Sequence, residues 1–411
     1  MQISNEKPGR SRLWFAVVLA AVTALVVAAC GDDSDSGDSG DSSEPISVGV
    51  SLPLTGEFSQ PGKAAQQGYE IWEQTVNNEG GMLDRDVELV VKDDASDQNT
   101  VVTDYNALIQ KDQVDLLLGT FSSLLNLPAS AAAERNRMLY IEPAGGAPEI
   151  FERDFQYGPF FTQQATADKQ GDLFVEYVLG LPENERPQTA AYPVLDDPFA
   201  LPVIEAMKAK LEAGGVETVY EETYPASTSN FDSIANAVKA ADPDLVANGA
   251  QFDDGIGFSR SLTKVGFDPE IFFQTNAPSF GSQYSDGVGE ENANGVFFAI
   301  SHTPDASTPG NEEFVQAFEE KFGDPPAEDA ADAYASGQVL QAAVEGVGSI
   351  DDQLALADWL RENTVETILG ELEWEDTGAP IGEFLIGQWQ DGKAEIVLPE
   401  EAATSEPEIG Q

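Results

Sequence analysis

The chain has 411 residues, of which 41% are hydrophobic and 9% aromatic, so it can bury a large core and is too long for one ordinary domain. Its 73 acidic residues against 20 basic ones give a formal net charge of -53 at pH 7. Such a charge repels nucleic acid and anionic membrane surfaces, so we exclude nucleic acid as a partner.

The N-terminal region has the pattern of a secretory signal. Lys7, Arg10 and Arg12 precede an uncharged apolar run at 13–29, which ends in small residues before Cys30. A retained transmembrane helix is the alternative, because a run of this length is near the lower limit for a bilayer span. The immediate change to Ser, Gly and Asp suits a cleavage site better than the basic flank of a retained helix.

Cys30 is the chain's single cysteine, and the sequence Val-Ala-Ala-Cys that ends there resembles the lipobox of prokaryotic lipoproteins. The resemblance implies removal of a signal peptide, 1–29, and acylation of Cys30, which would anchor the protein on the extracytoplasmic face of a cell membrane. A lipidated Cys30 leaves no thiol for disulfides, cysteine metal sites or a cysteine nucleophile. Residues 30–45 hold this lipidated cysteine and an acidic, low-complexity tether that we predict to be disordered.

The remaining acidic residues are spread along nearly the whole chain rather than gathered in one segment. That distribution favours a solvent adaptation over a ligand site. Strongly acidic surfaces suit proteins that work in high salt, where screening over a few ångströms removes the self-repulsion. We therefore hypothesise a saline habitat.

From Ile46 onward, apolar runs of strand length alternate with longer amphipathic windows, which predicts repeated β-α units around parallel sheets. The first series has strands at 46–52, 87–92, 114–119 and 138–141 and helices at 63–78 and 99–112. The second has strands at 189–194, 216–224, 245–248, 271–274 and 296–299 and helices at 166–179, 201–212, 231–241 and 255–265. Helices at 312–321, 329–347 and 354–362 and strands at 371–374 and 384–389 follow. Two α/β lobes are predicted, with a ligand outside the carboxyl ends of their strands.

Several segments resemble a known family. They are VGVSLPLTG (48–56), NNEGGMLDR (77–85), VELVVKDDASD (87–97), LLGTFSS (117–123), YPASTSNFD (224–232), LGELEWEDTG (369–378) and GQW (387–389). They look like the solute-binding proteins of branched-chain amino acid ABC transporters. The resemblance covers 46–398 and implies the type I periplasmic binding protein fold, with two doubly wound α/β lobes joined by three crossovers.

The family's fold implies crossovers near Gln163, His302 and Gly370. The first lobe would then comprise 46–162 and 302–370, and the second 163–301 and 371–398, followed by a flexible tail at 399–411. The resemblance further implies a monomer that binds a small-molecule ligand and docks on an ABC permease in the membrane. It implies no cofactor and no enzymatic activity.

The family's first lobe binds a ligand carboxylate with backbone N–H groups and hydroxyls. By position these fall on Ser122 and Ser123 after one strand and on Ala144, Gly145 and Gly146 after the next. A helix N-terminus with nearby hydroxyls and glycine backbone tolerates an anion. The alternatives are simple N-capping by Ser122 and a tight turn at the glycines. Gly146 departs from relatives that often carry a hydroxyl residue there.

The family's second lobe offers aromatic residues and a carboxylate that meets the ligand's ammonium group. The matching positions are Phe199, Gln251 and either Asn276 or Ala277, of which Phe199 could equally be a core residue. None of these residues is acidic.

A buried ammonium group needs a compensating partner. The missing carboxylate therefore argues against an ordinary α-amino acid unless Asp253 or Asp254 replaces it. An amide, an uncharged polar solute or an aromatic acid would suit the remaining residues.

Two further interpretations concern the acidic residues and the single histidine. Asp93, Asp94 and Asp97 stand between a strand and a helix, where capping accounts for them, with a calcium site as the alternative. A secreted hydrolase would have to use His302. A sensor of the same fold, coupled to a signalling partner, is the second functional candidate. A neighbouring permease and ATPase in the genome would favour import over sensing.

Overall fold

The computed structural model describes residues 44–410. The predicted signal peptide, Cys30 and nearly all of the predicted tether lie outside the described residues. Within the described part of the chain, no helix combines the length and the apolar character needed to cross a membrane.

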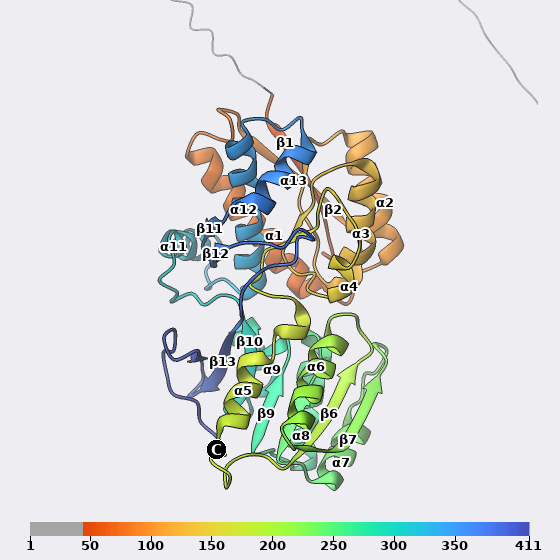
Figure 1. The fold of residues 1–411 in the computed structure, drawn as a ribbon, viewed down its shortest axis with the longest axis vertical. Coiled ribbons are helices and arrows are strands. Elements are labelled where there is room, and N and C mark those ends of the chain that lie inside the picture. The colour runs from red at the N-terminus through yellow and green to blue at the C-terminus, as the bar shows by residue number, and fades with distance from the viewer. Residues whose placement is uncertain (1–43, 411) are drawn as a thin grey trace, which may run out of the picture. The chain divides into compact units, whose positions relative to one another are not determined.

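The first sheet is parallel. Strand β1 (Ile46–Leu52) pairs with β2 (Val87–Asp93) on one side and with β3 (Leu116–Leu117) on the other. A bridge from Leu118 to Ile141 continues the order to β4 (Ile141–Glu142), which pairs with β5 (Phe160–Phe161). Figure 1 shows these elements in the upper half of the ribbon. The sequence prediction missed β5, because two residues of strand show no periodicity.

Helices cover both faces of this sheet. Those of the first β-α series are α1 (Ser59–Asn78), α2 (Gln98–Ala107, continued by a π-helical turn at Leu108–Asp112), α3 (Ser123–Asn136) and α4 (Pro148–Phe151). Those of the return segment are α11 (Asn311–Phe322), α12 (Glu328–Val347) and α13 (Gln353–Glu362). The prediction left α3 unassigned, since Pro128 interrupts its pattern and small residues on several sides of the helix are buried.

Strand β1 shows how the two faces are filled. Ile46, Val48 and Val50 are fully buried in the core that β1 forms with α1 and α12. Gly49 faces the other way, where an added Cβ would lie 2.9 Å from Val114 and 3.2 Å from Leu108. Alternate residues of one strand therefore pack against different helix layers, as the pleat requires.

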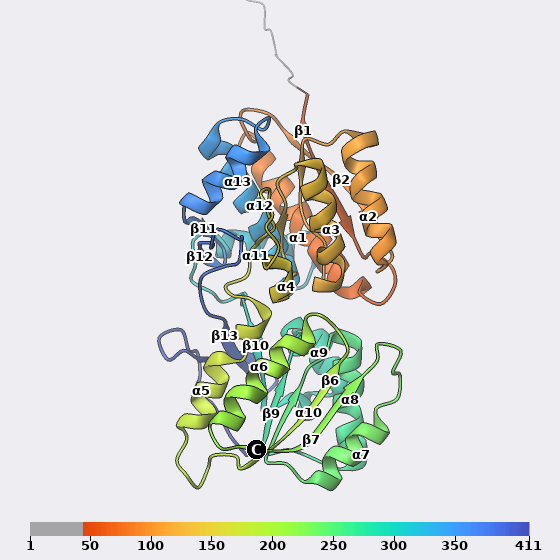
Figure 2. The same cartoon turned by 45° about the vertical axis from the view of Figure 1, so that its right-hand side comes forward.

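Helices α1 and α12 lie side by side in Figures 1 and 2 because two glycines let them approach closely. A Cβ on Gly68 would lie 1.9 Å from the carbonyl oxygen of Ala330, and one on Gly337 would overlap the ring of Trp72 at 2.3 Å. This packing sets the position of the first turn of α12.

The second sheet has seven strands in the order β14-β13-β10-β9-β8-β6-β7. The parallel ones are β6 (Thr189–Leu195), β7 (Glu217–Tyr224), β8 (Leu245–Asn248), β9 (Ile271–Gln274) and β10 (Val296–Ile300). Its helices are α5 (Asp172–Gly180), α6 (Ala200–Ala213), α7 (Asp232–Ala241), α8 (Phe252–Val265), α9 (Ser282–Val288) and α10 (Glu290–Ala293). Figure 2 shows α5 and α6 on one face of this sheet and α7 and α8 on the other.

An antiparallel hairpin completes the second sheet. Strand β13 (Leu385–Gln390) runs antiparallel to β10, and β14 (Lys393–Leu398) runs antiparallel to β13. Asp391 and Gly392 have φ values of 49° and 80° in the turn. The sequence analysis predicted neither β14 nor the antiparallel edge, although Asp-Gly between two apolar runs is a strong hairpin signal.

The third crossover lies later than predicted. Leu372 and Trp374 pack in the core of the first lobe, and the Trp374 indole N–H donates to the carbonyl of Phe161 at 2.7 Å. Ala379 also packs against Phe161. Residues 371–379 therefore belong with the first lobe, and the chain crosses between Ala379 and the start of β13. The indole hydrogen bond and the Phe161 N–H, which donates to the Gly378 carbonyl at 3.3 Å, retain the segment, and neither has a local sequence signature.

The C-terminal segment is attached rather than flexible as far as Gly410. The Gln388 amide donates to the carbonyl of Glu408 at 2.6 Å and accepts from its N–H at 2.9 Å. Gln390 donates to the carbonyl of Glu406 at 2.8 Å, and Ile409 packs against the second core. The predicted frayed tail is wrong because side-chain amides of β13 satisfy its backbone.

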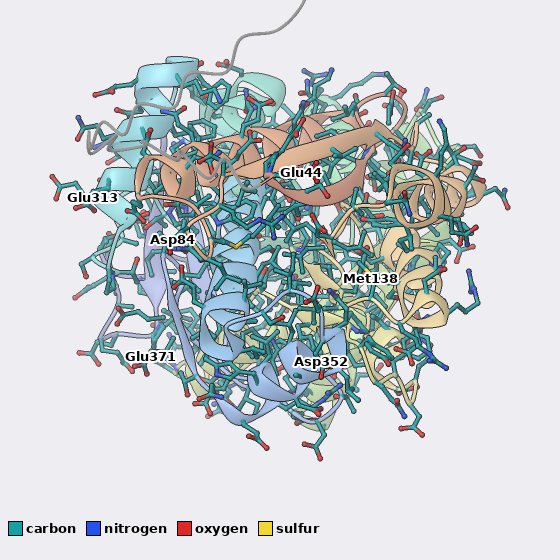
Figure 3. The ribbon with its side chains drawn as sticks, turned by 90° about the horizontal axis from the view of Figure 1, so that it is seen from above. Glu44, Asp84, Met138, Glu313, Asp352 and Glu371 are labelled. Carbon is teal, nitrogen blue, oxygen red and sulfur yellow. The ribbon has the colours of Figure 1, made fainter. Side chains whose placement is uncertain are left out.

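The acidity lies mainly on the surface. Figure 3 looks down on the first lobe and labels Glu44, Asp84, Glu313, Asp352 and Glu371, all of which are exposed. Seven ion pairs join described residues. Most surface carboxylates in this part of the chain therefore have no cationic partner to offset their mutual repulsion.

Salt should consequently stabilise the fold. Because 1 M salt shortens the Debye length to about 3 Å, we expect the melting temperature to rise by about 5 °C or more between dilute buffer and molar KCl. Differential scanning calorimetry measures this shift, with sucrose of equal osmolality as the uncharged control. Equal melting temperatures in the two salt conditions would contradict the saline-habitat hypothesis.

Candidate functional site

A cavity lies between the two lobes at the carboxyl ends of their strands. The space between its atoms is about 480 Å³, a volume that includes the opening to solvent. Its lining comes from loops after β3 and β4, from loops after β6, β8 and β9, and from the crossovers. This is the place where ligands bind in open parallel sheets.

In the first lobe, the predicted residues Ser122, Ala144 and Gly146 line the cavity. Ser122 has a φ of 73° and caps α3, where its hydroxyl accepts the N–H of Leu125 at 3.4 Å. Ser122 therefore both caps α3 and lines the cavity. A Cβ on Gly146 would lie 3.1 Å from the Phe161 ring, so a hydroxyl side chain there would require the ring to shift.

Two other predicted residues of this wall lie off the lining. The Ser123 hydroxyl is fully buried and accepts the N–H of Ala147 at 3.0 Å, which joins α3 to the next loop. Gly145 faces Glu142, whose carboxylate oxygens would lie 2.6 Å from an added Cβ. The geometry therefore gives both residues supporting positions, and their contact with a ligand stays a prediction.

Glu142 is a buried carboxylate that the sequence analysis missed. The Ala144 N–H donates to its Oε2 at 3.0 Å, and the Gly145 N–H is also directed at it. Burial raises the pKa of Glu142 to about 8. In the sequence, the sign of this buried carboxylate is a glutamate within an apolar strand. Two N–H groups expected to meet a ligand carboxylate are thus already directed at a carboxyl group of the protein.

In the second lobe, Phe199, Gln251 and Asn276 all line the cavity. Phe199 also packs against the core of its lobe, so both interpretations of this residue hold. Asn276 is strained, with a φ of 52°, while its alternative Ala277 is fully buried and off the lining. Asp197 organises this wall by accepting the Phe199 N–H at 2.8 Å and the Gln251 amide at 3.3 Å.

Asp253 and Asp254 line a neighbouring part of the cleft rather than this cavity. Asp254 accepts the Tyr224 hydroxyl at 2.7 Å and the Gln251 N–H at 2.9 Å. Burial raises its pKa to about 7. The structure therefore does not place either aspartate where it would replace the missing carboxylate.

Carboxylates do reach the cavity from α12. Glu328 and Asp329, in its first turn, line the cavity together with Gln163 from the first crossover. The sequence analysis assigned these acids no role, because acidic residues at a helix start are ordinary dipole-compensating residues. Phe121, Phe161, Gln170 and Ala299 complete the lining.

Buried hydrogen bonds join the crossovers beside the cavity. Asp332 accepts the Gln163 amide at 2.6 Å and the Ser301 hydroxyl at 2.6 Å. The Ser301 hydroxyl also approaches Glu328 at 2.8 Å. Gln164 donates to the carbonyl of Ser301 at 3.0 Å and approaches that of Leu369 at 3.4 Å, so one side chain joins the first crossover to the second and to the first lobe.

The aspartates of the possible calcium site have other partners. Asp97 caps α2 by accepting the N–H groups of Asn99 and Thr100. Asp93 accepts three backbone N–H groups and the Thr55 hydroxyl, and Asp94 accepts the Thr120 hydroxyl at 3.1 Å. Among residues 44–410, no group of His, Cys, Asp or Glu is arranged to hold a metal ion.

His302 is not part of the cavity lining. It is buried, its Nε2 pairs with Asn311 Oδ1 at 2.7 Å, and burial lowers its pKa to about 4. The hydroxyl of its neighbour Ser301 points to Asp332 and Glu328. This arrangement does not form the base-nucleophile pair that a hydrolase needs.

The chain is similar to known proteins over most of its length. Residues 45–394 match the family model of the periplasmic binding proteins. The chain belongs to this family. The predicted family and fold class are confirmed, and the chain is a solute-binding protein that acts outside the cytoplasm and is not an enzyme.

Curated relatives align over most of their length. The chain is 26% identical over 352 residues to a Leu/Ile/Val-binding protein homolog of Brucella melitensis, covering 85% of this chain and 92% of that protein. It is 25% identical over 348 residues to the Leu/Ile/Val-binding protein of Escherichia coli, covering 84% and 91%.

Solved structures share the fold. A leucine-binding protein of Thermotoga maritima superimposes with a TM-score of 0.76 at 19% identity, covering 85% of this chain and 97% of the other. A solute-binding protein from R. palustris in complex with benzoate gives a TM-score of 0.75 at 20% identity, covering 89% and 99%.

Glu142 should make stability depend on pH. The folded-state pKa of Glu142 lies above the ordinary value of 4.5, so its neutral carboxyl group contributes to the free energy of unfolding. This contribution is complete below pH 4.5 and is lost as the pH rises towards about 8. Glu142→Gln keeps an acceptor for the Ala144 N–H and removes this loss. As the pH rises from 4.5 to about 8, we expect the free energy of unfolding of the variant to increase relative to that of wild type by about 2 kcal/mol or more.

Urea unfolding at several pH values at constant salt measures this difference. Glu313→Gln, at an exposed position, is the control for loss of one acidic residue. Parallel pH profiles for wild type and Glu142→Gln would contradict the prediction.

Proposed function

We propose that this protein is the lipid-anchored solute receptor of an ABC importer. It captures a small polar solute, such as an amino acid, an amide or a related compound, between its lobes and delivers it to a membrane permease. The observation that carries the proposal is the cavity lined by both lobes and by the crossovers. A ligand there touches every part that a hinge motion would move.

Closure follows from this arrangement. A ligand that contacts both walls binds the closed form more tightly than the open one, and only this difference in affinity shifts the population. The crossovers are the hinge, and the Gln164 contact with Ser301 keeps the first two together while the lobes move. The closed form, in which both lobes present a joint surface, is the one that we expect to dock on the permease as a monomer.

The names of the relatives support the solute class at a coarse level. Curated relatives are named as binding leucine, isoleucine and valine, and neighbours of the same fold were solved with isoleucine, leucine and benzoate. All of these are small solutes that carry a carboxylate. The present cavity carries the carboxylates of Glu328 and Asp329 on its lining.

A thermal-shift panel of amino acids, amides and ureas in molar salt tests the receptor function. At a concentration 100 times its Kd, a solute that binds only the folded state adds about 2.7 kcal/mol of stability. We expect a melting-temperature rise of about 3 °C or more and a smaller radius of gyration in X-ray scattering. A panel that produces neither change would contradict the proposal.

Phe199→Ala should weaken binding of the identified solute about tenfold, because it removes a ring from the cavity wall. Leu354→Ala, at an exposed position on α13, is the control. The melting temperature without ligand separates lost binding from lost folding.

Lipid anchoring has its own test. Cys30→Ser removes the sulfur that would carry an acyl chain, so the variant should move from the membrane fraction to the soluble extracytoplasmic fraction. Labelling with a fatty-acid analogue should mark wild type and not the variant. Equal labelling of both proteins would show that Cys30 is not the acylated residue.

A further inference from the structure

Among the described residues, the cavity between the lobes has acidic but no basic side chains on its lining. Its described lining includes the carboxylates of Glu328 and Asp329 and contains no lysine, arginine or histidine. The two acids differ in their partners. Glu328 accepts the Ser301 N–H and lies 2.8 Å from its hydroxyl, whereas the only N–H directed at the Asp329 carboxylate within residues 44–410 is its own.

The general acidity of the chain does not explain Asp329. Surface carboxylates are hydrated, whereas Asp329 is 6% exposed. A carboxylate in the first turn of a helix interacts favourably with the helix dipole, but this interaction does not require burial. Glu312 at the start of α11 has the same interaction and is exposed. Taking a carboxylate out of water costs several kcal/mol unless a partner compensates it.

A polar side chain of the second lobe lies on the same lining. Gln251, at the start of α8, lines the cavity and is 5% exposed. Its Nε2 donates to Asp197 at 3.3 Å, and its side-chain oxygen faces the Asp254 N–H in the capping box at the start of α8. Gln251 therefore adds a polar, uncharged surface to the lining and no positive charge.

Donors for a ligand carboxylate are reduced on the opposite wall. The N–H groups of Ala144 and Gly145 point to Glu142, beneath the loop. Phe121, Phe161 and Phe199 supply apolar surface around the remaining space. The lining as a whole suits an organic cation better than an anion of similar size.

We propose that the ligand is a small organic cation with N–H donors, such as a primary ammonium, amidinium or guanidinium compound, and that it needs no carboxylate. Asp329 pairs with its charge, and Gln251 contacts it from the second lobe. The inference rests on the proposed receptor function and narrows its ligand class. Because α12 belongs to the first lobe and Gln251 to the second, a cation that bridges them stabilises the closed form.

Matched solute sets test the inference on the mature protein by isothermal titration calorimetry. One set is isopentylamine, 4-methylpentanamide, 4-methylpentanoate and leucine. A second is benzylamine, benzamide, benzoate and phenylglycine, and a third pairs agmatine with arginine. In at least one set, the amine should bind about tenfold more tightly than any carboxylate that lacks an amino group. The affinity of this amine should equal or exceed that of the amino acid in the same set.

Asp329→Asn keeps the shape of the side chain and removes its charge. It should weaken binding of the amine about tenfold or more and change binding of the neutral amide less than about twofold. Glu312→Gln removes an acid from the first turn of α11, outside the cavity, and should leave both affinities unchanged. Melting temperatures of both variants confirm that they are folded.

The outcomes separate this inference from the receptor function. Tighter binding of the carboxylate or the amino acid than of the amine overturns the cation assignment, as does an unchanged amine affinity in Asp329→Asn. A protein that responds to another solute of the broad panel but to no amine also overturns it and remains a solute receptor. A protein that responds to no solute at all overturns both proposals.

Discussion

The hydrogen bonds that buried carboxylates of α12 accept from the crossovers are the constraint on which the site depends. Asp332 accepts from Gln163 in the first crossover and from Ser301 in the second. These bonds satisfy an acid that is fully buried, and they keep two chain crossings beside the first turn of α12. That turn lines the cavity, so the hinge and the ligand site share one polar network.

Residues far from the cavity determine the position of that turn. Gly68 and Gly337 allow α1 and α12 to pack in close contact, and β1 supports α1 through alternate buried residues. Small residues at a helix crossing therefore decide where Glu328 and Asp329 lie. Burial in this network raises the pKa of both carboxyl groups, first by desolvation, and for Asp329 also by the charge of Glu328.

Much of the fold could be predicted from the sequence, since strands such as β1 and β8 and helices such as α6 and α7 follow local periodicity closely. The errors occur where long-range contacts replace local pattern. The Trp374 indole retains the segment before β13 in the first lobe, and Gln388 attaches the tail. Six of the eight predicted ligand residues line the cavity, because positions after strands follow from the order of elements.

By itself, the sequence determined the family, the two α/β lobes, the acidic surface and the loops that meet at the cleft, because these depend on order, periodicity and composition. The tertiary structure alone decided which polar atoms are left without partners. It placed Glu142 under the Ala144 loop, put Gln251 on the cavity lining and buried Asp329 on the same lining. Burial and pairing are properties of contacts between distant residues, so no local pattern contains them.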